Sequence, residues 1–363
     1  MENRGLDDCT IKDGRHLTPA HSPLLADSQR GEGAGGADKT RITNVRLKME
    51  KTFNTQPVFL AGPTAVGKSE IALRLAEKIG GEIISVDSMQ VYRGLDIGTA
   101  KPSPAERKRV PHHLIDVCDL HEAFDAAQFV RLAEKAVAEI QARQKTPVFC
   151  GGTGLYFKAF RDGLGEAPAT DAKLRAELEA APLEILLDEL RERDPATFEN
   201  IDRQNPRRVI RAVEVIRLTG KKFSEQRAEW QAESGKRKAE KFFCFTRKAL
   251  DLHSRINARV DKMFRRGLVA ETEQLLKHGL AENKFAMQAI GYRQVVEHLH
   301  GERSLAETIE LVKIRTRQFA KRQLTWFRRH GNCEWIDLQS DKTADETLEE
   351  IVDSFAVYCG ITR

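Results

Sequence analysis

The stretch PVFLAGPTAVGKSE, residues 57–70, decides the fold. It opens with a short apolar run at 58–61 that predicts a buried strand, and an apolar helical pattern begins at Ile71. Between them, residues 62–69 read G-x-x-x-x-G-K-[ST], a motif that requires a strand before it and a helix after it. The sequence therefore predicts a phosphate-binding loop at the start of a helix.

The residues of this loop are suited to an anion. Gly62 and Gly67 allow the backbone to curl so that successive amide groups converge on one point, and the helix N-terminus adds about half a positive charge there. Lys68 supplies a full charge, and the Ser69 hydroxyl suits a Mg²⁺ ion that bridges phosphate oxygens. The loop thus predicts binding of a diphosphate or triphosphate without identifying the molecule that carries it. The residues expected to contact it are Gly62, Pro63, Thr64, Ala65, Val66, Gly67, Lys68 and Ser69.

Composition limits the class of protein. The chain has 363 residues, 40% hydrophobic and 31% charged, with a net charge of +5, which allows a large core and is mildly basic. No apolar run approaches the roughly 20 residues of a membrane span, so we expect no membrane partner. The six cysteines are scattered without a Cys-x-x-Cys pair, which favours reduced thiols in a cytoplasmic protein over a zinc module.

The chain divides into four expected parts. Residues 1–52 are polar with a glycine-rich run at 31–36, and we expect a disordered extension. Residues 53–165 alternate strands (58–61, 82–87, 113–117 and 147–150) with helices, which predicts parallel pairing with crossover helices. Residues 166–235 show only helical patterns and are expected to form an all-α insertion domain. Residues 236–363 return to the sheet at 242–246 and end in helices.

The predicted fold class is therefore α/β: a parallel-sheet core like that of P-loop NTPases, with helices on both faces and an all-α insertion. Open parallel sheets bind ligands at the carboxyl ends of their strands. The phosphate loop, Asp87 and Thr153 all follow strands and are expected to meet there. Asp87 is the natural general base, although a helix cap or an indirect Mg²⁺ contact would use the same residue.

Basic residues gather in two other places. One group lies on and beside a predicted helix of the insertion, and a second follows near the end of the chain. A solvated helix face is the usual explanation, but two patches beside a phosphate-loop core also suggest a polyanion. The groups are Arg203, Arg207, Arg208, Arg211, Arg217, Lys221 and Lys222, and Arg315, Arg317, Lys321, Arg322, Arg328 and Arg329.

Several motifs in one order resemble those of the tRNA dimethylallyltransferase family over residues 57 to about 340. The departures are small, with Val66, Ser69 and Leu95 at positions where the family often has Ser, Thr and Met. The matching segments are GPTAVGKS (62–69), ISVDSMQVY (84–92), LDIGTAKP (95–102), PHH (111–113), GGTGLY (151–156), NPRR (205–208), RAVE (211–214), IGYR (290–293) and KRQLTW (321–326).

The resemblance implies a donor, an acceptor and a cofactor. The loop would hold dimethylallyl diphosphate, and the acceptor would be N6 of adenosine-37 in the tRNA anticodon stem-loop of tRNAs that read codons beginning with U. Asp87 matches the family's base, and Lys68 would stabilise the charge of the leaving diphosphate. Thr64 would position donor and acceptor, and Ser69 would hold Mg²⁺. We expect the enzyme to act as a monomer.

The resemblance also implies residues that contact the tRNA. They fall into three segments, with two further single positions. They are Asp87, Ser88, Met89 and Gln90; Thr153; Arg175; Arg207, Arg208, Val209, Ile210 and Arg211; and Gln288, Ala289, Ile290, Gly291, Tyr292 and Arg293.

Three other functions share some of these features. A phosphate-loop kinase of a small metabolite would use Asp87 to activate a hydroxyl group. An enzyme that prenylates free adenine nucleotides would have little use for two basic patches. An RNA-binding module with a vestigial nucleotide site would not explain why Asp87 and Thr153 join the loop at the strand ends.

Overall fold

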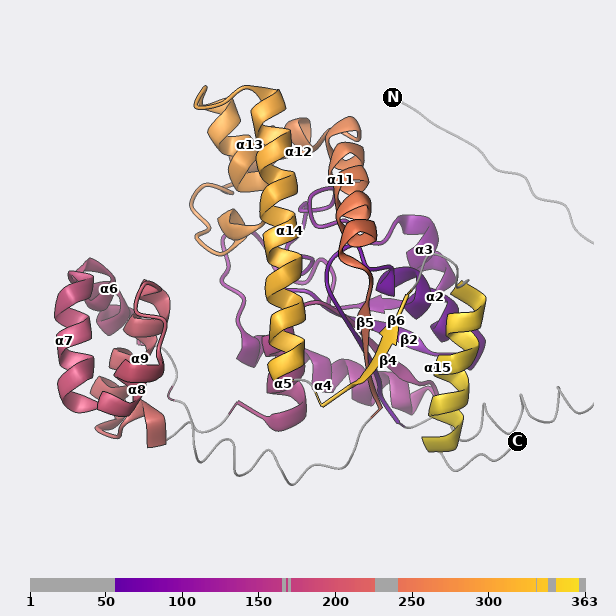
Figure 1. The fold of residues 1–363 in the computed structure, drawn as a ribbon, viewed down its shortest axis with the longest axis horizontal. Helices are drawn as coiled ribbons and strands as arrows, with labels where there is room; N and C mark the ends of the chain where they lie inside the picture. The colour runs from indigo at the N-terminus through magenta and orange to yellow at the C-terminus, as the bar shows by residue number, and fades with distance from the viewer. Residues whose placement is uncertain are drawn as a thin grey trace, which may run out of the picture. The chain divides into compact units, whose positions relative to one another are not determined.

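The core of the protein is one six-stranded parallel sheet with the strand order β3-β2-β4-β1-β5-β6 (Figure 1). The computed structural model describes residues 56–164, 168, 171–225, 241–330, 332–338 and 344–358. The central strand pairs Leu60 with Cys150 on one side and with Phe243 on the other. The strands are β1 (Val58–Ala61), β2 (Glu82–Val86), β3 (His112–His113), β4 (Pro147–Gly151), β5 (Phe242–Thr246) and β6 (Glu334–Asp337).

The third strand is shorter than the sequence predicts. We expected a strand at 113–117, but β3 ends at His113. Leu114 and Asp116 have φ angles of 61° and 57°, in the left-handed region that an extended strand cannot use. The chain therefore leaves the sheet immediately after β3.

Helices cover both faces of the sheet, as predicted. Val58 and Leu60 of β1 belong to one hydrophobic cluster, while Phe59 belongs to a second cluster on the opposite face, as the alternation of side chains along a strand requires. The helices of the core are α2 (Lys68–Ile79), α3 (Pro104–Arg109), α4 (Ala126–Ala142), α5 (Gly154–Asp162), α11 (Ala249–Arg265), α12 (Leu268–Lys277), α13 (Tyr292–Leu299), α14 (Leu305–His330) and α15 (Ala344–Tyr358), with a 3₁₀ turn, η1 (Ala286–Gln288).

The middle of the chain contains only helices among its described residues. They are α6 (Ala172–Ala180), α7 (Leu183–Arg193), α8 (Pro195–Asn200) and α9 (Pro206–Thr219). They share a separate cluster of buried residues that includes Leu178, Leu190 and Val213. Asp194 caps α8, where its Oδ1 accepts a hydrogen bond of 3.1 Å from the Thr197 amide. The predicted extension at 1–52 lies outside the described residues, and the domain limits stay predictions.

No described helix is both long and apolar enough to cross a membrane.

A buried carboxylate, Glu82, lies at the start of β2 and is 2% exposed. Arg143 donates to Glu82 at 2.6 Å, His113 Nε2 lies 2.8 Å away, and Lys145 Nζ lies 3.2 Å away. Burial disfavours the charge, but these hydrogen bonds outweigh it and lower the pKa of Glu82 to about 2.

The depressed pKa predicts how Glu82→Gln changes stability with pH. A carboxylate with a lowered pKa stabilises the fold above its unfolded pKa, near 4.5, and loses this contribution as the pH falls towards 2. The free energy of unfolding should therefore fall by up to roughly 3 kcal/mol in the variant at pH 7, and the difference should shrink below pH 4. Urea unfolding at pH 7, 5 and 3 measures it, and a pH-independent difference would contradict the assignment.

Candidate active site

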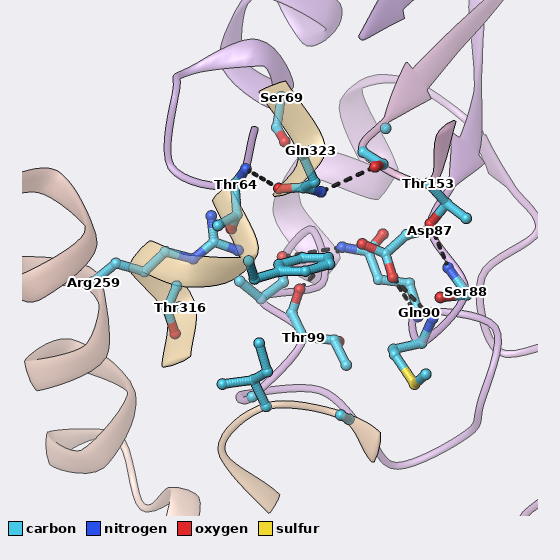
Figure 2. A pocket seen from close by; sticks show the side chains of 18 of the residues that line it. Thr64, Ser69, Asp87, Ser88, Gln90, Thr99, Thr153, Arg259, Thr316 and Gln323 are labelled. Carbon is cyan, nitrogen blue, oxygen red and sulfur yellow. Dashed lines mark hydrogen bonds between the residues drawn. The ribbon is translucent and has the colours of Figure 1, made fainter. Parts of the chain in front are cut away.

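A cavity of about 410 Å³ lies at the carboxyl ends of β1, β2 and β4 (Figure 2). Its wall is built from the phosphate loop, the segments after β2 and β4, α11, the turn around η1, and α14. Asp87 and Thr153, predicted to meet the loop at the strand ends, both line it together with Thr64, Lys68 and Ser69. The charged lining residues are three cations and one carboxylate: Lys68, Arg259, Arg322 and Asp87.

The phosphate loop has the conformation that its glycines predict. Gly62 and Gly67 have φ angles of 152° and 113°, and Ala65 is held at 64°. A side chain at Gly62 would come within 2.9 Å of the Phe245 carbonyl oxygen, so the close approach of β5 also requires glycine there. α2 begins at Lys68, immediately after this curl, and its N-terminus lies at the loop.

Three cationic side chains bind the carbonyl groups of the loop. Lys68 Nζ donates to the Pro63 oxygen at 3.1 Å. The Nε atoms of Arg255 and Arg247 donate to the oxygens of Ala65 and Val66 at 2.9 and 2.7 Å. Free carbonyl oxygens in the loop would repel an anion. Because the three cations bind these oxygens, the loop is more suitable for phosphate.

Positive charge accumulates beside the loop. Burial, with the neighbouring charge of Arg259, lowers the pKa of Lys68. Burial also lowers the pKa of Arg259, against the opposing attraction of Asp87. Both cations thus lack full compensation by protein charges, and an anionic ligand such as a diphosphate would supply it.

Asp87 is fixed by the turn that follows β2. Its Oδ1 accepts hydrogen bonds from the amides of Met89 at 2.8 Å and Gln90 at 3.2 Å. Among the described residues its Oδ2 has no hydrogen-bond partner, so it can accept a proton or bind a cation. The capping role and the base role that the sequence left open are therefore compatible, because each uses a different oxygen.

Two neighbours hold the Asp87 turn in place. The Thr153 hydroxyl accepts a hydrogen bond of 3.2 Å from the Ser88 amide. Gln90 accepts from the Ser85 hydroxyl at 2.9 Å and donates to the Thr99 carbonyl at 3.1 Å. Thr153 and Gln90 thus support the wall around Asp87, and both face the cavity (Figure 2).

Gln323 of α14 joins the loop to the end of β4. Its Oε1 accepts from the Thr64 amide at 2.8 Å, and its Nε2 donates to the Gly152 oxygen at 3.0 Å (Figure 2). A Cβ on Gly152 would come within 2.2 Å of this Nε2 atom. The side chain is 8% exposed and therefore holds the loop at a fixed distance from Thr153.

Gln323→Leu should loosen the loop without removing a charge. Two hydrogen bonds of about 1 kcal/mol each are lost, so the KM for a loop-bound diphosphate substrate should rise by up to roughly 30-fold while the KM for the second substrate stays the same. Steady-state kinetics with each substrate varied in turn measures the two KM values separately. Gln318→Leu, on an exposed position of the same helix, is the control, and equal effects of the two changes would contradict a positioning role.

Eight residues of the predicted tRNA-contacting set line the cavity. They come from the segment after β2, from the segment after β4, and from the turn around η1. They are Asp87, Ser88, Met89, Gln90, Thr153, Gln288, Ala289 and Ile290. Arg207 donates a hydrogen bond to Gln288 Oε1, which brings one arginine of α9 to this turn.

Other members of the set are engaged elsewhere. Val209, Ile210 and Tyr292 lie in hydrophobic clusters and are at most 7% exposed, because each faces the inner side of its helix. The Tyr292 hydroxyl donates to Glu271 at 2.6 Å and accepts from the Gly98 amide at 3.0 Å. These side chains do not face the surface, so their expected contacts with RNA receive no support from the structure.

The arginines of the set differ in their surroundings. Arg175 and Arg211 both bind the buried carboxylate of Glu214, at 3.3 and 2.8 Å. Arg293 pairs with Glu297 at 3.1 Å. Arg208 is exposed and forms no ion pair with a described residue, so of these four it is the most available to an anionic partner. Gly291, the last member of the set, has a φ of 104° and is the N-cap residue directly before α13.

Comparison with known proteins identifies the family. The model of the family described as "IPP transferase" matches residues 90–330. The chain belongs to the IPP transferase family. The tRNA dimethylallyltransferase of Geobacter sulfurreducens is 43% identical over 302 residues, which are 81% of this chain and 96% of that protein. The tRNA dimethylallyltransferase of Halorhodospira halophila is 45% identical over 307 residues, 83% of this chain and 97% of that protein.

Solved structures of similar proteins agree with the assignment of this chain to the IPP transferase family. The tRNA isopentenylpyrophosphate transferase of Bacillus halodurans is 39% identical, with a TM-score of 0.62 over 84% of this chain and 97% of that one. A eukaryotic dimethylallyltransferase acting on tRNA is 28% identical, with a TM-score of 0.70 over 85% of this chain and 80% of that one. The α/β fold is therefore shown, and the curated relatives are prenyltransferases rather than kinases.

Two polar residues of this IPP transferase site escaped the sequence analysis. Arg259 lies on α11, a helix whose role was not predicted, and Gln323 lay within a motif noted only for its resemblance. The spacing of Arg255 and Arg259, four residues apart, places both on one face of a helix and was the available signal. Nothing local marked Gln323, because its partners Thr64 and Gly152 are 259 and 171 residues away.

Proposed function

We propose that this IPP transferase moves the dimethylallyl group from dimethylallyl diphosphate to N6 of adenosine-37 in tRNAs that read codons beginning with U, and releases diphosphate. The observation that carries the proposal is the shared cavity, in which a carboxylate and a cationic phosphate loop face the same space. The curated relatives act on tRNA by name, which supports the acceptor.

The cavity suits a prenyl diphosphate because both the cationic loop and several apolar side chains line it. The loop amides, Lys68 and Arg259 would bind the diphosphate. An apolar wall suits a five-carbon chain and is made of Val260, Met263, Ile290, Val312 and Phe319. A nucleoside triphosphate would place its polar sugar against this wall, so the prenyl donor fits better.

The reaction needs a base and a stabilised leaving group. The exocyclic N6 is a poor nucleophile because its lone pair is conjugated with the ring. Asp87 would take the N6 proton as the new N–C bond forms, and the electron pair of the breaking C–O bond would leave with the diphosphate. Lys68, Arg259 and the loop amides would stabilise that growing negative charge, and Thr64 would position the donor.

A Mg²⁺ ion fits the site on chemical grounds. The Ser69 hydroxyl lines the cavity beside the loop, and Mg²⁺ commonly binds through one or two protein oxygens together with substrate phosphates. When bound, the ion would neutralise part of the diphosphate charge.

One experiment separates this function from phosphate transfer. The protein is incubated with unmodified tRNA, Mg²⁺ and either labelled dimethylallyl diphosphate or γ-labelled ATP. We expect label from the prenyl donor on adenosine-37 and none from ATP. Label arriving only from ATP would support the kinase instead and end the proposal.

A further inference from the structure

A buried tyrosine and a glutamate hold the backbone of a segment that lines the cavity. Residues 98–100 of this segment are part of the cavity wall. The Tyr292 hydroxyl accepts a hydrogen bond of 3.0 Å from the Gly98 amide and donates one of 2.6 Å to Glu271. Both carboxylate oxygens of Glu271 accept from the Ile97 amide, at 3.0 and 2.9 Å. The helices α12 and α13, which carry this pair, are thereby joined to the wall of the cavity.

Packing alone does not explain the polar groups of this pair. A Cβ on Gly98 would come within 2.4 Å of the Tyr292 ring, so the segment lies directly against the ring. A phenylalanine would fill the same buried space, and burying a hydroxyl group costs free energy unless it is hydrogen-bonded. Glu271 forms no ion pair with a described residue, and its carboxylate is a stronger acceptor than a neutral group. The pair therefore fixes the position of residues 97 and 98 more firmly than apolar contacts would.

The same segment is connected to Asp87 through Gln90. The Gln90 side chain donates to the Thr99 carbonyl at 3.1 Å, and both side chains face the cavity (Figure 2). The Gln90 amide donates to Asp87 Oδ1 at 3.2 Å. Because Asp87 is held by its Oδ1 atom, the place of its Oδ2 atom depends on where Gln90 lies. A continuous series of hydrogen bonds and peptide bonds thus runs from Glu271 to the carboxylate of Asp87.

We propose that Tyr292 and Glu271 are positioning residues that hold Asp87 in place for proton transfer, acting through residues 97–100 and Gln90. The proposal rests on the proposed function, because it takes Asp87 as the base. It replaces the role that the resemblance implied for Tyr292, a contact with the tRNA. The two roles have different kinetic consequences. A positioning residue changes the rate of the chemical step at saturating substrate, whereas an RNA contact changes the binding of tRNA.

Tyr292→Phe removes the hydroxyl group and keeps the ring in the core. The single-turnover rate with saturating tRNA and dimethylallyl diphosphate should fall by about five- to tenfold, the effect of losing about one hydrogen bond. The Kd for tRNA and the KM for dimethylallyl diphosphate should stay within about twofold of the wild-type values. An unchanged rate together with weaker tRNA binding would show that Tyr292 contacts the RNA, and the proposal would be wrong.

The segment has a second attachment, so the variant should shift it rather than unfold it. Lys101, whose side chain is 2% exposed, binds Asp96 at 2.7 Å and Asp116 at 2.5 Å. Lys101 Nζ also donates to the Tyr92 carbonyl at 2.6 Å. These contacts hold the far end of the segment and do not involve Tyr292 or Glu271.

Glu271→Ala tests the same pair from the other helix. It removes the acceptor of both the Ile97 amide and the Tyr292 hydroxyl, so it should lower the single-turnover rate at least as much as Tyr292→Phe. Glu273→Ala is the matched control, because Glu273 lies on the same helix, is exposed and forms no ion pair with a described residue. Equal rates of the Glu271 and Glu273 variants would contradict the proposal.

A double-variant cycle tests the connection through Gln90. Gln90→Ala removes the side chain that joins the segment to the turn of Asp87. In that background Tyr292→Phe should slow the reaction by less than about twofold further, because residues that act through one another do not have additive effects. If the two losses multiply instead, Tyr292 acts independently of Gln90 and the proposed connection is wrong.

The wild type separates this proposal from the proposed function. If the wild type transfers label to tRNA and Tyr292→Phe does so at the same rate, the positioning role is wrong and the proposed function stands. If the wild type transfers no label to tRNA, the proposed function fails and the positioning role fails with it.

Discussion

Asp87→Asn is expected to lower kcat by a factor of 10² or more while tRNA binding is kept. The amide retains an oxygen that can accept from the Met89 and Gln90 amides at the Oδ1 position, so the turn after β2 should keep its shape. It cannot accept a proton, and the loss of a general base costs about 10² to 10⁴ in rate. Single-turnover transfer with saturating tRNA, alongside a direct binding measurement, checks both halves of the prediction.

Asp87→Ala is the companion variant. It removes both the base and the cap of the turn, so it should lose as much rate as Asp87→Asn and also weaken tRNA binding. A result in which Asp87→Asn keeps full single-turnover chemistry and only Asp87→Ala is impaired would show that Asp87 is a cap and not the base.

Arg259→Met is expected to lower kcat by about 10² to 10³, the usual cost of removing one group that stabilises a leaving charge. Arg259 and Lys68 both line the cavity, and burial lowers the pKa of both groups. Asp87 is the one carboxylate among the described residues that line the cavity, so it cannot balance both positive charges. Lys68→Met should have an effect of the same size. Rapid-quench measurement of diphosphate release gives the rate.

The matched control is Lys262→Met. Lys262 lies three residues from Arg259 on α11 but is exposed and does not line the cavity, so its removal should change the rate less than twofold. Equal losses in the Arg259 and Lys262 variants would mean that α11 acts through its general charge or its stability, and the role assigned to Arg259 would be wrong.

The sequence predicted the features of the site that lie close together in the chain. The glycines and Lys68 of the loop follow a strand and precede a helix, and this local pattern defines their geometry. Asp87 and Thr153 were placed correctly beside the loop because the carboxyl ends of parallel strands meet at one edge of a sheet. The structure also has side-chain caps at Ser103, Asp125 and Asp194, each directly before its helix and of a residue type that favours this position.

Features that depend on distant packing could not be predicted in this way. Gln323 reaches the loop only because α14 crosses the ends of β1 and β4. Tyr292 was assigned to the RNA surface by its motif, yet its ring lies in the core and its hydroxyl binds Glu271. The early end of β3 at His113 follows from the left-handed backbone angles of Leu114 and Asp116. Aspartate is enriched in this region, but leucine rarely adopts it, so the residue type at 114 gave no signal of the break.

The most direct test of the central claim is a crystal structure with Mg²⁺ and a dimethylallyl diphosphate analogue whose bridging oxygen is replaced by sulfur, so that it does not react. The account predicts the diphosphate on the loop within hydrogen-bond distance of Lys68 and Arg259, and the five-carbon group in the cavity on the side of Asp87. An analogue bound outside the cavity, or a prenyl group directed away from Asp87, would contradict the account.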